Sequence, residues 1–275
     1  MSHNNQKKIA AINDMTGFGR CALTVLLPVI SHLKVQCCPV PTSIFSNHTA
    51  YPEYFFDDYT RHLREYMDNW DKLGLQFDGI VSGFLGSAEQ IEIVKEFIHR
   101  FKKEKGVVIV DPVMGDDGKI YATYTEDMCK KMRELVAEAD IVTPNVTELC
   151  VLTGNEYKEK WSRKELDRIV LELAAMGPEK IVVTGINMGI YIGNYVYEKG
   201  GQGTVVKAKK TGIIRCGTGD LFTSIIAADA VNGEELVRSV RKAAGFIKEC
   251  IRISDEMQIP KEDGVAFEEI LYRLK

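Results

Sequence analysis

No apolar run in this sequence is long enough to cross a membrane. The longest such run near the N-terminus, residues 21–30, has about half of the ~20 residues that a spanning helix needs. Polar residues fill the first eight positions, so the apolar core of a secretory signal is missing as well. We therefore expect a cytoplasmic protein that neither inserts into a membrane nor is secreted.

The sequence also lacks a pairing pattern among its cysteines. There are seven, an odd number, and none forms a Cys-x-x-Cys pair. This distribution argues against a disulfide framework and against a zinc site, and it fits a reducing compartment. The Asn-x-Thr sequons at Asn47 and Asn145 are accordingly not expected to carry glycans.

An excess of basic charge is absent too. The chain has 35 Lys and Arg against 39 Asp and Glu, and its basic runs at residues 102–103 and 207–210 are short. Nucleic-acid-binding proteins usually carry net positive charge or a basic stripe, so this class is disfavoured. With 275 residues, 45% of them hydrophobic, the chain can bury one large core, which excludes disorder as its dominant state.

Strand-like and helix-like segments alternate along the chain. Apolar runs predict strands at residues 8–13, 35–39, 78–81, 107–110, 141–142 and 180–184, and residues 191–197 alternate as an antiparallel strand would. Helical spacing predicts helices at residues 20–33, 58–73, 87–105, 126–138, 145–153, 160–176, 219–231 and 234–253, with Ser87 and Gln90 as a capping box. This alternation indicates a mostly parallel sheet with helices on both faces. No linker or repeat interrupts it, so we expect one α/β domain over residues 1–275.

Ligands of such sheets bind at the carboxyl ends of the strands, and four polar segments lie where such a site is expected. They are residues 13–19, 111–116, 143–148 and 217–220. The first contains Gly17-x-Gly19 but not the third glycine of a dinucleotide fingerprint, so that interpretation is weak. No GxxxxGK[ST] pattern is present, which excludes a P-loop.

The segment Gly217-Thr218-Gly219-Asp220 opens an apolar helix. Two glycines allow backbone N–H groups to approach an anion where the helix dipole favours negative charge. Asp220 beside such a hole suits a base that takes a proton from an attacking hydroxyl. An equally good alternative from the tetrapeptide alone is that Asp220 only complements the helix dipole.

The acidic residues of the other segments have two interpretations as well. Asn145 and Glu148 have the spacing of a capping box, which by itself is the better account, and Asp111 has the position of a residue that bonds its own turn. The alternative is a site of hard oxygen ligands for Mg²⁺ and phosphate. Three such clusters after successive strands, together with an anion-binding turn, favour a magnesium–triphosphate site.

Several segments together resemble pyridoxal kinase, of the ribokinase-like superfamily. The segment Gly217-Thr218-Gly219-Asp220 marks only the superfamily. Two segments are more specific to pyridoxal kinase: Phe45-Ser46-Asn47-His48-Thr49 and Asp111-Pro112-Val113-Met114-Gly115. The resemblance also includes Thr143-Pro144-Asn145-x-x-Glu148 and Ser82-Gly83-Phe84-Leu85-Gly86-Ser87. The resemblance extends to about residue 253. It implies a three-layer α/β/α sandwich with a central, mostly parallel sheet.

The resemblance also implies an activity and its cofactors. Pyridoxal kinases transfer a phosphoryl group from ATP to the 5′-hydroxymethyl group of pyridoxal, pyridoxamine or pyridoxine. They use a divalent metal, here expected to be Mg²⁺, with another divalent ion or K⁺ as further candidates. The family is commonly dimeric, so the resemblance implies a homodimer.

By position in these motifs, the resemblance assigns roles to individual residues. It makes Asp220 the catalytic base and Gly217, Thr218 and Gly219 the anion hole. On the nucleotide side it implies Asp111, Asn145, Glu148, Thr184 and Gly185, with Asp111 and Glu148 holding the metal and Tyr121 to Tyr124 in a flap over ATP. The vitamer pocket would be lined by Thr42, Ser46, His48 and Phe84.

One position departs from the family pattern. Where many pyridoxal kinases have a serine that bonds the pyridine ring, this chain has Asn13-Asp14-Met15. A carboxylate at Asp14 can accept a hydrogen bond from a protonated ring nitrogen or the 3-hydroxyl group, and its charge favours the amine vitamer. We therefore expect a changed vitamer preference and retained activity.

Some assignments and the whole function have alternatives. By residue type alone, His48 is as often structural as substrate-binding, Phe84 is by default a core residue, and Cys216 is a small buried hydrophobe. For the function, the alternatives are hydroxymethylpyrimidine kinase, a sugar kinase of the superfamily, and a non-catalytic vitamer-binding protein. The segment at residues 45–49 favours pyridoxal kinase over the other kinases, and Asp220 argues against a pure binder.

Overall fold

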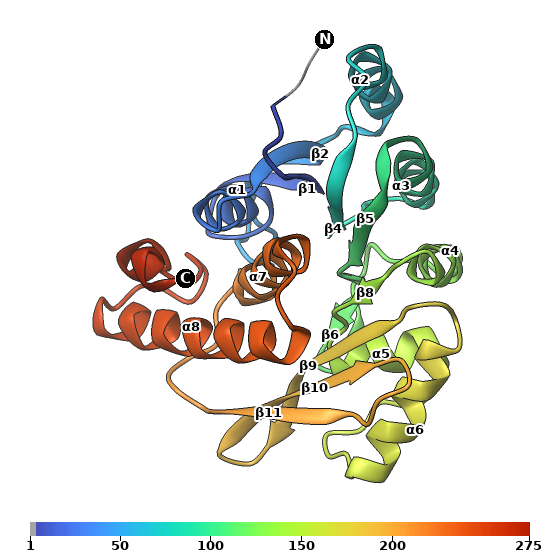
Figure 1. Ribbon diagram of the computed structural model, residues 1–275. Helices are drawn as coiled ribbons and strands as arrows, with labels where there is room; N and C mark the ends of the chain where they lie inside the picture. Colours follow the sequence, from blue (N-terminus) through green and yellow to red (C-terminus); the bar gives the residue numbers. More distant parts are fainter. Residues whose placement is uncertain (1–3) are drawn as a thin grey trace.

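Six neighbouring parallel strands form the centre of a nine-stranded sheet in the computed structural model, which describes residues 4–275 (Figure 1). The order is β11-β10-β9-β8-β5-β4-β1-β2-β3, and the outer strands β3, β10 and β11 are antiparallel to their neighbours, with β3 and β11 at the two edges. The strands are β1 (Lys8–Phe18), β2 (Gln36–Asn47), β3 (Phe56–Asp58), β4 (Phe77–Ser82), β5 (Lys102–Val110), β8 (Ile141–Val142), β9 (Lys180–Met188), β10 (Tyr191–Glu198) and β11 (Thr204–Lys209). A separate hairpin pairs β6 (Gly115–Asp116) with β7 (Lys119–Ile120).

Helices cover both faces of this sheet, as Figure 1 shows, so the expected three-layer sandwich is confirmed. One face carries α1 (Leu23–His32), α7 (Thr218–Asn232), α8 (Leu236–Glu256) and the 3₁₀ helix η1 (Glu268–Arg273). The other face carries α2 (Thr60–Lys72), α3 (Ala88–Phe101), α4 (Glu126–Ala137), α5 (Val146–Thr153) and α6 (Arg163–Ala174). None of these helices is both long and apolar enough to cross a membrane.

The central strands are buried on both faces, which explains why they appear in the sequence as short apolar runs. In β1, Ile9 and Ala11 face the core beneath α1 and α7, whereas Ala10 and Ile12 face the core beneath α2 and α3. Helix α7 is buried along nearly its whole length between the sheet and its neighbours. A helix that is apolar on all sides is stable only in such an interior position.

The predicted helix over residues 87–105 is wrong at its C-terminal end. Helix α3 stops at the fully buried Phe101, and residues 102–105 belong to β5. Lys102 pairs with Phe77 of β4 and lies 3.2 Å from Asp140, and Lys103 lies 2.8 Å from Asp78. Pairing with the neighbouring strand has thus overridden the helix propensity of a lysine-rich segment.

The expected capping box at the start of α3 is only half formed. The Ser87 hydroxyl accepts a hydrogen bond from the Gln90 N–H at 3.1 Å. The Gln90 side chain turns elsewhere, since its oxygen accepts from the Gly86 N–H at 2.7 Å and its amide donates to the Thr42 carbonyl at 2.9 Å. Gln90 therefore joins α3 to β2 instead of closing the box.

Other element boundaries also differ from the predictions. The first helix begins at Leu23 instead of residue 20, because Ala22 has a positive φ of 50°. Strands β1 and β2 continue to Phe18 and Asn47, well past the predicted ends at residues 13 and 39. The sequence analysis missed the short elements β3, β6, β7 and β11, whose residues have no long apolar pattern.

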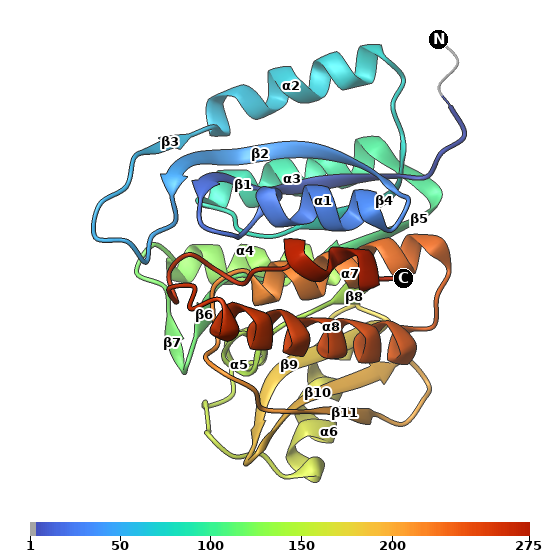
Figure 2. The ribbon, with the colours of Figure 1, turned by 90° about the vertical axis from the view of Figure 1, so that its left-hand side faces the viewer.

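This topology brings the polar segments to one edge of the sheet. Strand β1 pairs with β2 on one side and with β4 on the other, so the strand order reverses between β1 and β4. In open α/β sheets, ligands bind outside the carboxyl ends of the strands at such a reversal. The loop at residues 48–55 and the β6–β7 hairpin project from this same edge (Figure 2).

Candidate active site

The N-terminus of α7 has backbone N–H groups that no side chain caps. Its N-cap residue, Gly217, has a φ of 81° and makes no side-chain capping bond. A Cβ at this position would lie 1.9 Å from the Arg20 carbonyl oxygen, so only glycine fits here. A Cβ at Gly219 would meet open space. The first turn of α7 can therefore accept an anion closely against its backbone.

Asp220 lies in this first turn, and burial raises the pKa of its carboxyl group above the usual range. Three hydrogen bonds act against this rise: they come from the Ala22 N–H, from the N–H of Asp220 itself and from the Asn13 amide, whose Nδ2 lies 3.4 Å from Asp220 Oδ1. A carboxylate with a raised pKa beside an anion hole has the properties of a general base.

Asn13 is a site residue that the sequence analysis did not single out. Its Oδ1 accepts hydrogen bonds from the N–H groups of Asp14 and Phe84, both at 2.9 Å, while its Nδ2 reaches Asp220. A Cβ at Gly83 would come within 2.4 Å of Asn13 Nδ2, so the chain after β4 must have glycine there. Asn13 thus connects β1, the segment after β4 and Asp220 at the point where the strand order reverses.

The partly buried Asp111 and the buried Glu148 form an acidic pair. Asp111 Oδ2 accepts from the Thr223 hydroxyl of α7 at 2.8 Å, and burial raises the pKa of Asp111 to about 7. The two Glu148 oxygens accept from the N–H groups of Met114 at 3.2 Å and Asn145 at 2.8 Å. Burial and the nearby Asp111 charge raise the pKa of Glu148 as well.

The structure forms the capping box that the spacing of Asn145 and Glu148 predicts. Asn145 Oδ1 accepts from the Glu148 N–H at 2.9 Å, and its amide donates to the Gly115 carbonyl at 2.8 Å. The Asp111 carboxylate, in contrast, accepts a hydrogen bond from Thr223 and not from the backbone of its own turn. Capping therefore accounts for Asn145 and Glu148 locally but leaves the burial of Asp111 unexplained.

This acidic pair fits a divalent cation. Among residues 4–275, no group of three or more His, Cys, Asp and Glu side chains is arranged to hold a metal. Two carboxylates with raised pKa values nevertheless suit a Mg²⁺ ion that takes its remaining ligands from phosphate and water, as Mg²⁺ usually does. Such an ion would offset the repulsion between Asp111 and Glu148.

Thr184 and Gly185 both lie within β9, which continues to Met188 and so passes its predicted end at residue 184. They form a bulge, because two residues of β9 stand opposite Asn194 alone in β10. Gly185 has a φ of 73° and open space where a Cβ would be. The Thr184 N–H donates to the Pro144 carbonyl at 2.9 Å, which joins the bulge to the start of α5. A bulge of this kind re-aims side chains at a sheet edge.

The two ends of the segment predicted as a flap, residues 121–124, differ in their exposure. Tyr121 is 42% exposed and follows the β6–β7 hairpin, whereas Tyr124 is 7% exposed and packs in the core. The projecting part of this region is thus the hairpin at residues 115–120 with Tyr121 at its end.

A partly buried pair of aromatic rings, Phe45 and Phe84, lies next to Asn13. Phe84 and Phe45 meet edge to face with ring centroids 6.4 Å apart, and the Thr42 hydroxyl donates to the Phe84 carbonyl at 3.1 Å. Asp14 is 8% exposed and accepts from the Thr16 hydroxyl at 2.6 Å. Burial raises the pKa of Asp14 to about 6, and the nearby Asp220 charge adds to this.

Ser46, near the end of β2, and His48, just after β2, both have partners within the protein. The Ser46 hydroxyl accepts from the Phe55 N–H at 2.8 Å and donates to Asn47 Oδ1 at 2.7 Å. His48 Nε2 contacts the Glu262 carbonyl oxygen, and its Nδ1 lies 4.0 Å from Cys216 Sγ. These contacts give both residues a structural role, and their substrate contacts stay predictions.

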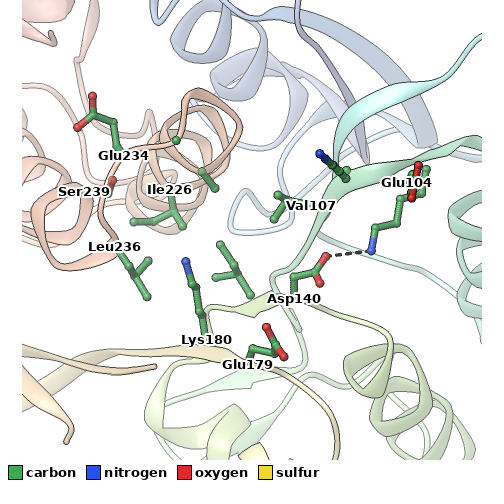
Figure 3. A pocket seen from close by; sticks show the side chains of 15 residues that line it. Glu104, Val107, Asp140, Glu179, Lys180, Ile226, Glu234, Leu236 and Ser239 are labelled. Carbon is green, nitrogen blue, oxygen red and sulfur yellow. Dashed lines mark hydrogen bonds and ion pairs between the residues drawn. The ribbon is translucent and has the colours of Figure 1, made fainter. Parts of the chain in front are cut away.

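A cavity of about 450 Å³ lies at the other end of the sheet (Figure 3). It is lined by the starts of β5 and β9, by the start of α8 and by the end of α7, with lysines and acids of opposite charge around it. Its position at the amino ends of the strands separates it from the residues described above.

Comparisons with known proteins agree with this architecture. A family model described as phosphomethylpyrimidine kinase matches residues 27–266. A crystal structure of a candidate phosphomethylpyrimidine kinase from Bacteroides thetaiotaomicron is 36% identical, has a TM-score of 0.97 and covers 100% of this chain and 96% of that one. A structure with the same description in another crystal form, with pyridoxal, has a TM-score of 0.94 at 36% identity and covers 98% of this chain and 96% of that one.

Pyridoxal kinases are also similar to this chain. One from Histophilus somni is 26% identical over 256 residues, which cover 86% of this chain and 85% of that protein. The structure of pyridoxal kinase from Lactobacillus plantarum has a TM-score of 0.91 at 24% identity, covers 98% of this chain and 97% of that one, and shows the same fold. The resemblance found in the sequence motifs is thus confirmed.

Replacing Asp111 with Asn is expected to stabilise the metal-free protein above pH 7. Burial holds the pKa of folded Asp111 at about 7, against ~3.9 in an unfolded chain. Between these values the folded state binds more protons, so the free energy of unfolding falls as the pH rises from about 4 to 7. The Asn side chain keeps an acceptor for Thr223 but carries no charge.

Thermal unfolding in a chelating buffer at pH 5 and pH 8 measures this effect. The Asp111→Asn variant should have a Tm that is a few degrees above wild type at pH 8, with a smaller difference at pH 5. The exposed Asp127→Asn exchange, in the first turn of α4, is the control. A lower Tm for Asp111→Asn at pH 8 would contradict the burial argument.

Proposed function

This chain belongs to the phosphomethylpyrimidine kinase family and is an ATP-dependent phosphotransferase, and we propose that its acceptor is the 5′-hydroxymethyl group of a B6 vitamer. The vitamers in question are pyridoxal, pyridoxamine and pyridoxine. The observation that carries this proposal is the contact of Asn13 with both Asp220 and the backbone of Phe84. It places a base and an uncapped helix N-terminus next to the aromatic pair Phe45 and Phe84.

In this proposal, Asp220 takes the proton of the 5′-hydroxyl group as that oxygen attacks the γ-phosphorus of ATP. The bond between the γ-phosphorus and the β–γ bridging oxygen breaks, and ADP leaves with that oxygen. The N–H groups of Gly217, Thr218 and Gly219 hold the transferring phosphoryl group. Phosphoryl transfer depends mainly on positioning and charge stabilisation, which a fixed backbone cradle supplies without reorganisation. Asp220 is held by Ala22 and Asn13 at the edge of this cradle.

The nucleotide side of the site would be formed by Asp111, Asn145, Glu148 and the bulge at Thr184 and Gly185. Mg²⁺ held by Asp111 and Glu148 would neutralise phosphate charge when bound. Tyr121 and the β6–β7 hairpin would cover ATP and exclude water, which otherwise competes for the phosphoryl group.

The vitamer ring would lie against Phe84, close to Thr42 and Asp14. Asp14 has a pKa of about 6, so it is mostly ionised at neutral pH. A buried carboxylate is stabilised by a cation or a hydrogen-bond donor, and a protonated vitamer supplies both.

A second candidate acceptor is hydroxymethylpyrimidine, because the family model carries the name phosphomethylpyrimidine kinase. Both acceptors present a hydroxymethyl group on a heteroaromatic ring, so the base and the anion hole would serve either one. The segment at residues 45–49 and the structural relative solved with pyridoxal favour the B6 vitamers. The predicted homodimer stays a prediction that sedimentation equilibrium would check.

A coupled assay of ADP release with four acceptors tests the proposed function. We expect turnover with pyridoxal, pyridoxamine and pyridoxine, and a lower kcat/KM with hydroxymethylpyrimidine. Asp220→Asn should lower kcat at least ~100-fold, the low end for general-base catalysis, and leave ATP binding intact.

Asp229→Asn serves as the control for that variant, because Asp229 lies in the same helix at the end remote from the site. Turnover with hydroxymethylpyrimidine alone would transfer the assignment to the second candidate. A lack of turnover with every acceptor would leave a non-catalytic binding protein as the better account.

Asp14→Ser should reduce the preference for the amine vitamer. The exchange removes a buried negative charge that favours a cationic ligand, so kcat/KM for pyridoxamine should fall relative to pyridoxal. The kcat/KM ratios of the three vitamers, measured for both enzymes at pH 7.5, give the answer. Ratios that do not change would remove Asp14 from specificity.

Asn13→Asp should move the acid limb of the kcat/KM profile to higher pH. The variant keeps an acceptor for the Phe84 and Asp14 N–H groups but replaces the donor to Asp220 with a carboxylate. The pKa of Asp220 should then rise further, since a donor that favours its charged form is exchanged for a like charge. Since the base must be ionised, activity should fall more at pH 6 than at pH 8. An acid limb that stays in place would show that Asn13 does not act on Asp220.

A further inference from the structure

A buried arginine directly precedes the anion hole. Arg215 is 5% exposed and lies two residues before Gly217. Arginine is seldom buried without partners, because removing a charge from water is costly. The contacts of Arg215 therefore show what its burial accomplishes.

The guanidinium group joins three segments of the chain. Its Nη1 donates to the Ile213 carbonyl at 2.8 Å and lies 2.6 Å from Asp255 Oδ1. Its Nη2 donates to the Ile259 carbonyl at 3.0 Å. Arg215 thus fastens the loop before α7 to the last turn of α8 and to the segment that follows it.

The carboxylate of Asp255 is fitted closely to the same loop. A Cβ at Gly212 would lie 1.8 Å from Asp255 Oδ2, so the backbone of Gly212 packs against this oxygen. The guanidinium and the carboxylate together hold residues 212–215 between α8 and the start of α7.

The backbone of Arg215 continues this arrangement into the anion hole. Its carbonyl accepts from the Thr218 hydroxyl at 3.3 Å. On the far side of the turn, Gly217 packs on the Arg20 carbonyl. The turn that aims the first N–H groups of α7 is therefore held from both sides.

Stability alone is a weak reason for such a pair. Replacing a buried ion pair with apolar residues of similar volume often leaves the folding stability unchanged or raises it. The ion pair, in contrast, fixes its two partners in a specific geometry. A planar fork that meets two carbonyls and a carboxylate fixes a loop in one position, which a lysine cannot do in the same way.

We propose that Arg215, paired with Asp255, is a positioning residue that holds the Gly217–Gly219 anion hole in its catalytic geometry. The proposal rests on the assignment of that anion hole under the proposed function. Displacement of catalytic groups by about 1 Å can cost ~10²-fold in rate, so fixing this loop has a large kinetic effect.

Arg215→Met and Arg215→Lys test the proposal, with Lys242→Met as the matched control. Lys242 Nζ lies 2.6 Å from Asp229 Oδ1, and this pair also joins α7 to α8, but at the far end of α7. Arg215→Met and Lys242→Met each lose an ion pair, and Arg215→Lys keeps the charge but loses the guanidinium fork, so all three are expected to change Tm. Only the Arg215 variants should lose kcat, by about 100-fold for Met and about 10-fold for Lys.

The division between kinetic parameters separates positioning from a loss of folded protein. KM for the acceptor should stay within about threefold of wild type, and the acid limb of the pH profile should not move, because burial, Ala22 and Asn13 set the pKa of Asp220. Guanidinium ion at tens of millimolar should restore part of the kcat of Arg215→Ala, whereas the same concentration of methylammonium should not.

A kcat that stays within threefold of wild type in Arg215→Met and Arg215→Lys would overturn the proposal. So would an equal loss of kcat in Lys242→Met. If the wild-type protein turned over none of the four acceptors, the proposed function would fail on its own. In that case the rate of slow ATP hydrolysis to ADP, a reaction that would use the same anion hole, would replace kcat as the quantity compared among these variants.

Discussion

The uncapped N-terminus of α7 is the feature on which the rest of this structure depends. A helix end whose N–H groups lack partners is costly unless an anion or water meets them. The surrounding residues keep it open and aimed, because Gly217 rests on the Arg20 carbonyl and Arg215 fixes the preceding loop. Further along the same helix, Thr223 bonds Asp111 and lies 3.2 Å from the Thr143 hydroxyl. Helix α7 therefore sets the positions of both the anion hole and the acidic pair.

The charge distribution follows from the same constraint. Asp14, Asp111, Glu148 and Asp220 gather at one edge of a chain whose formal net charge is −4, and burial raises the pKa of each. A site for ATP built in this way cannot rely on a basic patch. Under the proposed function, the backbone dipoles at the start of α7 and a bound divalent cation would supply the positive potential.

The sequence predicted the site segments better than the roles within them. Three polar segments follow apolar runs that end at the same sheet edge, and the fourth opens an apolar helix. Asp111, Asn145 and Asp220 could therefore be placed from patterns and a family resemblance. Asn13 and Arg215 could not, because their roles depend on partners 71 and 44 residues away in the chain. Helix α3 was predicted too long for a related reason, since a strand pairing with Phe77 overrides the local propensity of Lys102. The spacing of Asn145 and Glu148 predicted a capping box correctly. Because the oxygens of that box would also serve the metal site, the predicted metal site stays a prediction.

The most direct test of this account is a crystal structure with ADP, aluminium fluoride and pyridoxal, in which the fluoride complex mimics the transferring phosphoryl group. The account predicts the complex at the N–H groups of Gly217, Thr218 and Gly219, with the 5′-oxygen of the vitamer within ~3 Å of an Asp220 oxygen. A fluoride complex bound away from the start of α7, or a vitamer whose hydroxyl group points away from Asp220, would contradict it.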